Sequence, residues 1–273
     1  MKIDFDARYF SPKDTLECGQ VFRFTPYKDG YLINSADRIA YVYENGNKTV
    51  IESEDCDYFY NYFDLERDYK KIVDAATAFG IPLLTKSANL CKGLRILNQN
   101  REEMIYSFII SQNNNIPRIK GIIHKICLAL GEKRNSPYGE YYAFPPSSAV
   151  ANADVSVFKN AGAGYRDAYL KETAQRICSE GIKHLDGLDT ANLKKQLLTY
   201  KGIGPKVADC VAFFAFRKTD SFPVDTWIEK VYAEDFKGTL KNRDKIAKYL
   251  TDTFGENSGY VQQYLFYGKR SNL

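Results

Sequence analysis

The sequence has few of the residues that build metal centres and disulfide frameworks. Its 273 residues include two histidines, His124 and His184, and six cysteines that form no Cys-x-x-Cys pair. Disulfide scaffolds, zinc sites and four-cysteine iron–sulfur clusters depend on regular or paired cysteine spacings. We therefore expect no disulfide, no metal site and isolated, mostly buried thiols.

Long apolar runs and a strong charge of one sign are missing as well. No stretch approaches the roughly 20 apolar residues of a membrane span, and the start, Met1 to Asp6, lacks the apolar run of a signal peptide. We expect an intracellular, soluble protein, without a membrane partner and monomeric. The net charge of +4 permits a polyanionic partner but does not require one.

The hydrophobic pattern changes along the chain and predicts an α+β fold. Up to about residue 90, β-branched and aromatic runs alternate with turn residues, and Asn45-Gly46 is a strong hairpin candidate because both residues tolerate a positive φ. After residue 90 we expect helices and no further strands. The sequence thus predicts an antiparallel-sheet domain with helices over residues 1–90 and a larger all-helical domain over residues 91–273. The predicted strands cover 20–25, 31–35, 38–44 and 48–52, and the predicted helices cover 56–79, 101–111, 115–130, 167–180, 190–200, 205–217, 225–235, 242–253 and 257–268.

Residues 190–217 have the pattern of two helices joined by a tight turn, "KGIGPK". Gly202 and Gly204 let the backbone turn sharply while Ile203 anchors the turn in the core, and Pro205 suits the first turn of the next helix. Backbone amides left free at that helix start can face a phosphate. The pattern resembles the helix-hairpin-helix, which binds the DNA backbone. A plain pair of helices with a glycine-rich turn is the alternative.

Lys206 and Asp225 are the candidate catalytic residues. Lys206 stands in the first turn of the second helix, where the helix dipole disfavours a positive charge. A partly buried amine there should lose proton affinity and become a better nucleophile, whereas the alternative is an ordinary phosphate-contacting lysine. Asp225 follows Pro-Val and precedes a helix, so it is a candidate N-cap, with Thr226 and Glu229 as a competing capping box. Capping alone is a sufficient alternative for the aspartate.

"KGIGPKVADC" followed by "FPVDTW" resembles the helix-hairpin-helix glycosylase superfamily, and within it the 8-oxoguanine DNA glycosylases. That resemblance implies a bifunctional DNA glycosylase and abasic-site lyase of base excision repair, which acts on 8-oxoguanine in double-stranded DNA, opposite cytosine, without a metal or organic cofactor. The nucleotide would rotate out of the duplex. Lys206 would then attack the anomeric carbon to give a Schiff base, and Asp225 would stabilise the positive charge on the sugar.

Two further matches imply which residues bind the damaged base. "LECGQVFRF" supplies Gly19, whose carbonyl would accept a hydrogen bond from the N7–H that 8-oxoguanine has and guanine lacks. "GYVQQYLFYG" supplies Gln262 for the Watson–Crick edge and Phe266 for the face of the base. Cys210 and Pro223 would complete the pocket. A strand-entry glycine and a purely structural amphipathic helix are the alternatives for the two segments.

Two other segments resemble those that contact the cytosine left unpaired. "FIISQNNNIPRIKG" supplies Asn113 and Arg118, and "GAGYRDAYL" supplies Tyr165 as a wedge and Arg166 as a second arginine on the cytosine. A polar loop and a glycine-rich helix start are the alternatives. One departure is Trp227, which stands where the animal-type pattern has a phosphate-contacting histidine. The remaining candidate DNA contacts are Gly202 and Gly204 of the hairpin and a basic face of Arg118, Lys120, Lys194, Lys195 and Lys201.

Two other functions stay open on the sequence. A non-catalytic helix-hairpin-helix module would bind DNA without using the Lys206 amine. Another glycosylase of the superfamily would remove a different damaged base. However, the thymine-glycol and adenine-mismatch branches typically carry an iron–sulfur cluster, whose cysteine spacing is missing here, and the alkylation-repair branch lacks the lysine. The strength of the opposite-base preference, the acceptance of ring-opened purines and the efficiency of the lyase step are left open too.

Overall fold

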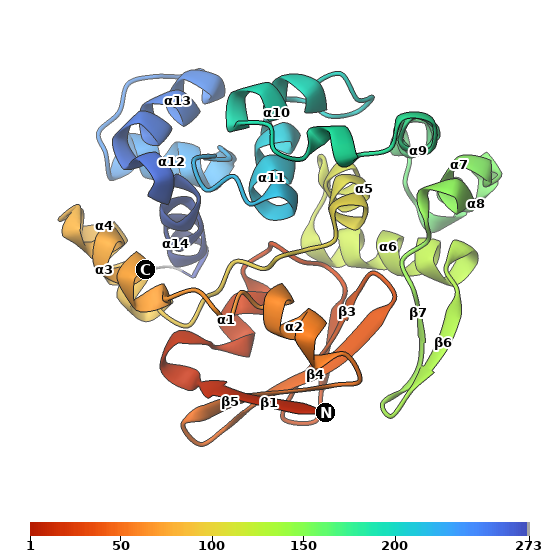
Figure 1. Cartoon of the computed structure of the whole chain (residues 1–273). Coiled ribbons are helices and arrows are strands. Elements are labelled where there is room, and N and C mark those ends of the chain that lie inside the picture. Colours follow the sequence, from red (N-terminus) through yellow and green to blue (C-terminus); the bar gives the residue numbers. More distant parts are fainter. Residues whose placement is uncertain (272–273) are drawn as a thin grey trace.

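The computed structural model of the chain describes residues 1–271 and confirms an α+β fold, in which a five-stranded antiparallel sheet lies against a larger group of helices (Figure 1). Residues 272–273, the end of the predicted helical domain, lie outside the described residues. The strand order is β1-β5-β4-β3-β2. The strands are β1 (Lys2–Asp6), β2 (Phe24–Tyr27), β3 (Gly30–Ser35), β4 (Arg38–Asn45) and β5 (Lys48–Ser53).

The Asn45-Gly46 hairpin is confirmed. Asn45 pairs with Lys48 across the β4–β5 turn, and Gly46 has a φ of +63°. The predicted strand over residues 20–25 is largely wrong, because only Phe24 and Thr25 of that range join the sheet. Gln20 is fully buried and, as described below, bonds a distant segment. β1 is not among the predicted strands, although its residues alternate between exposed and partly buried positions.

The helices of the first ninety residues divide between two hydrophobic cores. The predicted helix over 56–79 is two helices, α2 (Cys56–Tyr62) and α3 (Tyr69–Ala78), because Asp64 has a φ of +54° and Asp68 caps the second helix. α1 (Pro12–Glu17) and α2 pack on the sheet, whereas α3 and α4 (Pro82–Leu90) pack on the C-terminal helix. The domain boundary near residue 90 stays a prediction, and helices on its N-terminal side share the core of the helical part.

The helices after residue 90 follow the predicted ranges closely, and α7 and α8 are additional. They are α5 (Arg101–Ser111), α6 (Ile116–Leu130), α7 (Ser147–Asn152), α8 (Val155–Ala161), α9 (Arg166–Glu180), α10 (Thr190–Leu197), α11 (Pro205–Phe216), α12 (Thr226–Glu234), α13 (Arg243–Phe254) and α14 (Ser258–Arg270). No helix within residues 1–271 combines the length and the apolar character that crossing a bilayer requires.

The expectation of no strands after residue 90 is wrong. β6 (Lys133–Ser136) and β7 (Gly139–Tyr142) form a hairpin that projects beside the sheet in Figure 1. Gly139 has a φ of +108° and closes the turn. Tyrosines fix the hairpin to the sheet, because Tyr138 donates to the Glu52 carbonyl at 3.2 Å and Tyr141 to the Asp37 carbonyl at 2.9 Å.

A buried glutamine fixes the turn that follows α1. The Gln20 amide donates to the carbonyls of Thr15 at 2.9 Å and Arg95 at 2.7 Å, and its oxygen accepts from the Leu97 amide at 3.0 Å. The Gln99 side chain donates in turn to the Gln20 carbonyl at 2.8 Å. Because buried polar groups are costly to leave unpaired, this network holds residues 15–20 against the segment that leads into α5. Gly19 lies within this fixed turn.

Candidate active site

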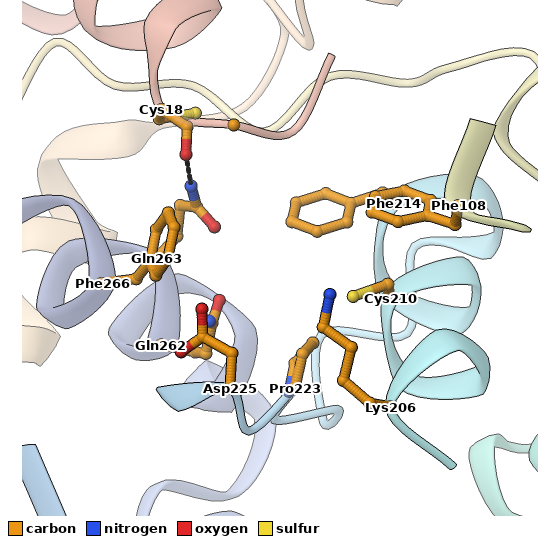
Figure 2. Close-up of a pocket in the computed structure, with 11 residues that line it drawn as sticks. Cys18, Phe108, Lys206, Cys210, Phe214, Pro223, Asp225, Gln262, Gln263 and Phe266 are labelled. Carbon is orange, nitrogen blue, oxygen red and sulfur yellow. Dashed lines mark hydrogen bonds between the residues drawn. The ribbon is translucent and has the colours of Figure 1, made fainter. Parts of the chain in front are cut away.

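One cavity collects all the predicted catalytic and base-binding residues. It lies where the Gly19 turn meets α5, α11, the start of α12 and α14 (Figure 2). Its free volume is about 60 Å³. The lining residues are Cys18, Gly19, Phe108, Lys206, Cys210, Phe214, Pro223, Asp225, Gln262, Gln263 and Phe266.

The turn between α10 and α11 presents Lys206 to this cavity. Gly202 has a φ of +80°, and a Cβ there would lie 2.5 Å from Cδ2 of Tyr169, so the turn requires glycine. Ile203 is buried and Pro205 is the first residue of α11, as predicted. Figure 2 shows the Lys206 amine directed at the cavity beside the Cys210 sulfur. The expected partial burial of Lys206 is wrong: the residue is exposed, because it stands at the cavity mouth.

Cys210 lies one helical turn after Lys206 and is 3% exposed. Burial raises the pKa of its thiol to about 11, although the nearby Lys206 charge acts in the opposite direction. The thiolate is the nucleophilic form of cysteine. Cys210 is therefore a neutral thiol at neutral pH, and Lys206 has no competing thiolate beside it.

Asp225 is the N-cap of α12, as predicted. Its Oδ1 accepts from the backbone amides of Trp227 at 3.0 Å and Ile228 at 2.9 Å. The competing capping box does not form, because Glu229 pairs instead with Arg243 at 2.6 Å. Within residues 1–271 no hydrogen bond engages the second carboxylate oxygen. In Figure 2 the carboxylate and the Lys206 amine flank Pro223 and border the same opening.

α14 supplies an amide and an aromatic ring from adjacent turns. Gln262 is 5% exposed, and its Oε1 is buried without a hydrogen-bond partner among residues 1–271. Phe266 lies four residues later on the same face of the helix. Gly19 has a φ of +92°, and a Cβ there would lie 3.5 Å from Cε1 of Phe266. The turn and the ring therefore pack directly on each other.

Known proteins are similar to this chain in sequence and fold. The family model of the 8-oxoguanine DNA glycosylase N-terminal domain matches residues 2–105. A Methanothermobacter thermautotrophicus protein named "Probable N-glycosylase/DNA lyase" is 30% identical over 233 residues, which are 77% of this chain and 74% of that protein. The solved apo form of Clostridium acetobutylicum 8-oxoguanine glycosylase/lyase is 35% identical, with a TM-score of 0.91 over 97% of this chain and 95% of that one.

The same clostridial enzyme has been solved in complex with double-stranded DNA that contains cytosine opposite 8-oxoG. That protein is 34% identical to this chain. The match covers 100% of this chain and 98% of that one, with a TM-score of 0.92. This chain belongs to the 8-oxoguanine DNA glycosylase family. The predicted resemblance is thereby confirmed for the fold and the family.

Four residues of this glycosylase's cavity are absent from the sequence prediction. Phe108 and Phe214 stack with ring centroids 5.5 Å apart and form one wall. Phe214 follows Cys210 by one helical turn, so the spacing of α11 could have found it, whereas nothing local distinguishes Phe108 from core residues. Cys18 and Gln263 are each adjacent to a predicted residue, and their role depends on a contact between the two ends of the chain.

The predicted contacts to the unpaired cytosine form a second group, outside the cavity. Asn113 is exposed, has a φ of +46° and donates to the Tyr165 hydroxyl at 3.3 Å. Tyr165 is 50% exposed, and Arg118 is exposed with a 3.4 Å contact to the Gly162 carbonyl. The side chains of Asn113, Arg118 and Tyr165 therefore remain accessible.

Arg166 differs from the other members of this group. It is 4% exposed, and its guanidinium donates to the carbonyls of Ala163 at 2.9 Å and Gln112 at 3.0 Å. Gln112 in turn donates to the Gly202 carbonyl at 2.8 Å. Arg166 thus stabilises the loop of residues 112–115, and Gln112 of that loop is hydrogen-bonded to the turn between α10 and α11.

The predicted basic face is smaller than expected. The Lys194 amine forms an ion pair at 2.5 Å with Asp209, which is 4% exposed. This ion pair joins α10 to α11. The Lys120 amine lies 3.6 Å from the centroid of the Phe24 ring, and burial lowers its pKa. At Trp227, where a histidine is expected, the Lys230 amine lies 5.1 Å from the indole ring.

Proposed function

We propose that the protein excises 8-oxoguanine from duplex DNA and then cleaves the strand through a Schiff base on Lys206. The observation that carries the proposal is the meeting, at one cavity, of an amine, a carboxylate, a stacking ring and an amide oxygen that has no hydrogen-bond partner within residues 1–271. Reaching the sugar carbon requires the nucleotide to leave the stack. The cavity of about 60 Å³ is well below the ~300–1,000 Å³ of sites that enclose drug-sized ligands. We therefore expect Phe266 and its neighbours to move outward as the base enters.

Recognition of the base is assigned to the Gly19 turn and α14. The Gly19 carbonyl accepts from N7–H of 8-oxoguanine, Gln262 bonds the Watson–Crick edge and Phe266 stacks on the ring. Guanine presents a lone pair at N7, so the same carbonyl faces an acceptor and gains no bond. An unpaired or repelled buried polar group discriminates strongly against an analogue. Cys210 and Pro223 form the adjoining wall.

The chemistry is assigned to Lys206 and Asp225. As the N-glycosidic bond breaks, its electron pair leaves with the base, which is then protonated, and positive charge develops on the sugar. The Asp225 carboxylate stabilises that charge, an effect of about 2.7–4 kcal/mol for one well-placed group. The Lys206 nitrogen bonds the anomeric carbon. One of its protons passes to O4′ as the C1′–O4′ bond breaks, and the sugar ring opens to a protonated Schiff base. Loss of a C2′ proton then expels the 3′ phosphate.

The duplex is held by a second group of residues. The backbone amides of Gly202 and Gly204 face a phosphate, and Lys230 beside Trp227 supplies a cation where the animal-type pattern has a phosphate-contacting histidine. Tyr165 fills the vacated stack, and Asn113 and Arg118 bond the unpaired cytosine. Arg166 acts with them by holding the loop of residues 112–115. This set supports a preference for cytosine opposite the lesion.

Two alternatives predict different outcomes in one assay. A non-catalytic DNA-binding module binds 8-oxoguanine duplex without cleaving it, and a glycosylase for another base cleaves duplexes with thymine glycol or alkylated purines instead. The assay follows nicking of an end-labelled duplex with 8-oxoguanine opposite each of the four bases, beside an unmodified duplex. We expect cleavage of the 8-oxoguanine strand, fastest opposite cytosine. Binding without cleavage, or cleavage confined to the other lesions, would overturn the proposal.

A further inference from the structure

The four carbonyls of the turn at residues 17–20, which carries Gly19, differ in how they are bonded. The Cys18 carbonyl accepts from the Gln263 amide at 2.9 Å, and the Glu17 carbonyl accepts from the Arg270 guanidinium. On the other side, the Gln20 carbonyl accepts from Gln99 at 2.8 Å. Among residues 17–20, the Gly19 oxygen alone receives no hydrogen bond from any group within residues 1–271. Side chains from distant segments therefore bond the neighbouring carbonyls, and the one acceptor left without a partner belongs to a residue that lines the cavity.

One helix provides both the base contacts and two of these donors. Gln262 and Phe266, four residues apart, line the cavity, while Gln263 and Arg270, seven residues apart, share the adjacent face of α14. Gln263 is 2% exposed, and Figure 2 shows its amide reaching the Cys18 carbonyl above the cavity. The same rigid element thus fixes the acceptor relative to the amide and ring that contact the base.

Glycine makes this fixation necessary. Gly19 adopts a φ of +92°, and glycine has the softest backbone of any residue, so the peptide groups on its two sides rotate most easily. If the Gly19 carbonyl could turn away, its repulsion from the N7 lone pair of guanine would be relieved and guanine would be bound more easily. If the carbonyl is held in place, the repulsion persists and guanine is bound less tightly than 8-oxoguanine. The Gly19 carbonyl belongs to the Gly19–Gln20 peptide, so its direction is fixed only if the Cys18–Gly19 peptide before it is held as well, which the Gln263 amide does.

We propose that Gln263 is a specificity-determining positioning residue, which sets the Gly19 carbonyl by holding the Cys18–Gly19 peptide, with Arg270 in support. This inference rests on the proposed function, because it concerns discrimination between 8-oxoguanine and guanine. It also predicts an asymmetric effect. Loss of the Gln263 amide weakens the rejection of guanine more than it weakens the binding of 8-oxoguanine.

The test compares Gln263→Leu, which keeps the apolar bulk and removes the donor, with Tyr267→Phe. Tyr267 donates to Asp14 at 3.2 Å, so the control also removes one hydrogen bond between α14 and α1 but touches no carbonyl of the turn. Dissociation constants are measured for matched duplexes with 8-oxoguanine or guanine at the target position, with Lys206→Gln present in every protein to stop turnover. Single-turnover excision by the Lys206 forms is measured in parallel.

We expect Gln263→Leu to lower the preference for 8-oxoguanine about tenfold, which corresponds to one hydrogen bond of about 1.4 kcal/mol. Tyr267→Phe should leave the preference unchanged. An unaltered preference in folded Gln263→Leu would overturn the inference. If that variant does not fold, Gln263→Met, which is unbranched like glutamine and has no donor, decides on the same criterion. If the parent enzyme does not excise 8-oxoguanine at all, the proposed function fails instead, so the two failures are distinguishable.

Discussion

Replacing Asp225 by asparagine separates the two roles that the structure gives this residue. Asp225 Oδ1 accepts from two backbone amides at the start of α12, and the amide oxygen of asparagine can accept from the same groups. Asparagine and aspartate are equally good N-caps. The change therefore removes the negative charge and leaves the cap.

Each of the two effects has an expected magnitude. Loss of charge at a helix start costs about 0.3–1 kcal/mol, so the free energy of unfolding should fall by less than about 1 kcal/mol. Loss of a carboxylate that stabilises charge in the transition state should slow excision by about 10²–10³-fold, or about 2.7–4 kcal/mol. Asp225→Ala loses the cap as well, so it should be equally inactive and less stable by a further ~0.5–2 kcal/mol.

The two variants are compared by urea denaturation and by single-turnover excision from an 8-oxoguanine:cytosine duplex. The reasoning is refuted if Asp225→Asn excises within about threefold of the parent rate, since the charge would then have no part in the chemistry. It is refuted equally if Asp225→Asn is as unstable as Asp225→Ala, since its loss of activity would then reflect a damaged helix start.

Three further predictions follow from the geometry. Gly19→Ala must hold a φ of +92° and place a Cβ 3.5 Å from Phe266, so it should lose about 1–2 kcal/mol of stability and most of its excision rate, measured by denaturation and single turnover; a fully active variant would contradict the assigned turn. Tyr165→Ala, at a half-exposed position, should leave the melting temperature unchanged and weaken binding to lesion duplex in a titration, and equal affinity would exclude the wedge. Burial raises the pKa of Asp209 above 3.8, so its contribution to the free energy of unfolding is fully present below pH 3.8 and is lost as pH rises through the folded-state value; Asp209→Asn should remove this decline from a pH series of urea denaturations, and an unchanged pH profile would show that Asp209 does not titrate there.

The features that the sequence predicts well are those set by local chemistry. The hairpin turn needs glycine at Gly202, the N-cap needs a side-chain acceptor at Asp225, and the spacing of α11 places Cys210 on the face of Lys206. Each follows from residues within a few positions of one another. The structure agrees with these expectations because no distant contact opposes them.

The features that the sequence does not reveal depend on contacts between distant segments. Gln263 has its role only because α14 packs beside the turn after α1. Arg166 and Lys194 look like free cations in sequence, yet a loop backbone and the buried Asp209 engage them. The β6–β7 hairpin follows the same logic, since its tyrosines bond carbonyls of the sheet far earlier in the chain.

Trapping with borohydride tests the central claim most directly, because it reduces a Schiff base to a stable covalent bond between protein and DNA. Incubation with an 8-oxoguanine:cytosine duplex and borohydride should give a protein–DNA adduct, and digestion should map the attachment to Lys206. Lys206→Gln should give no adduct while still binding the duplex. An adduct of equal yield in Lys206→Gln, or attachment mapped to another lysine, would contradict the account.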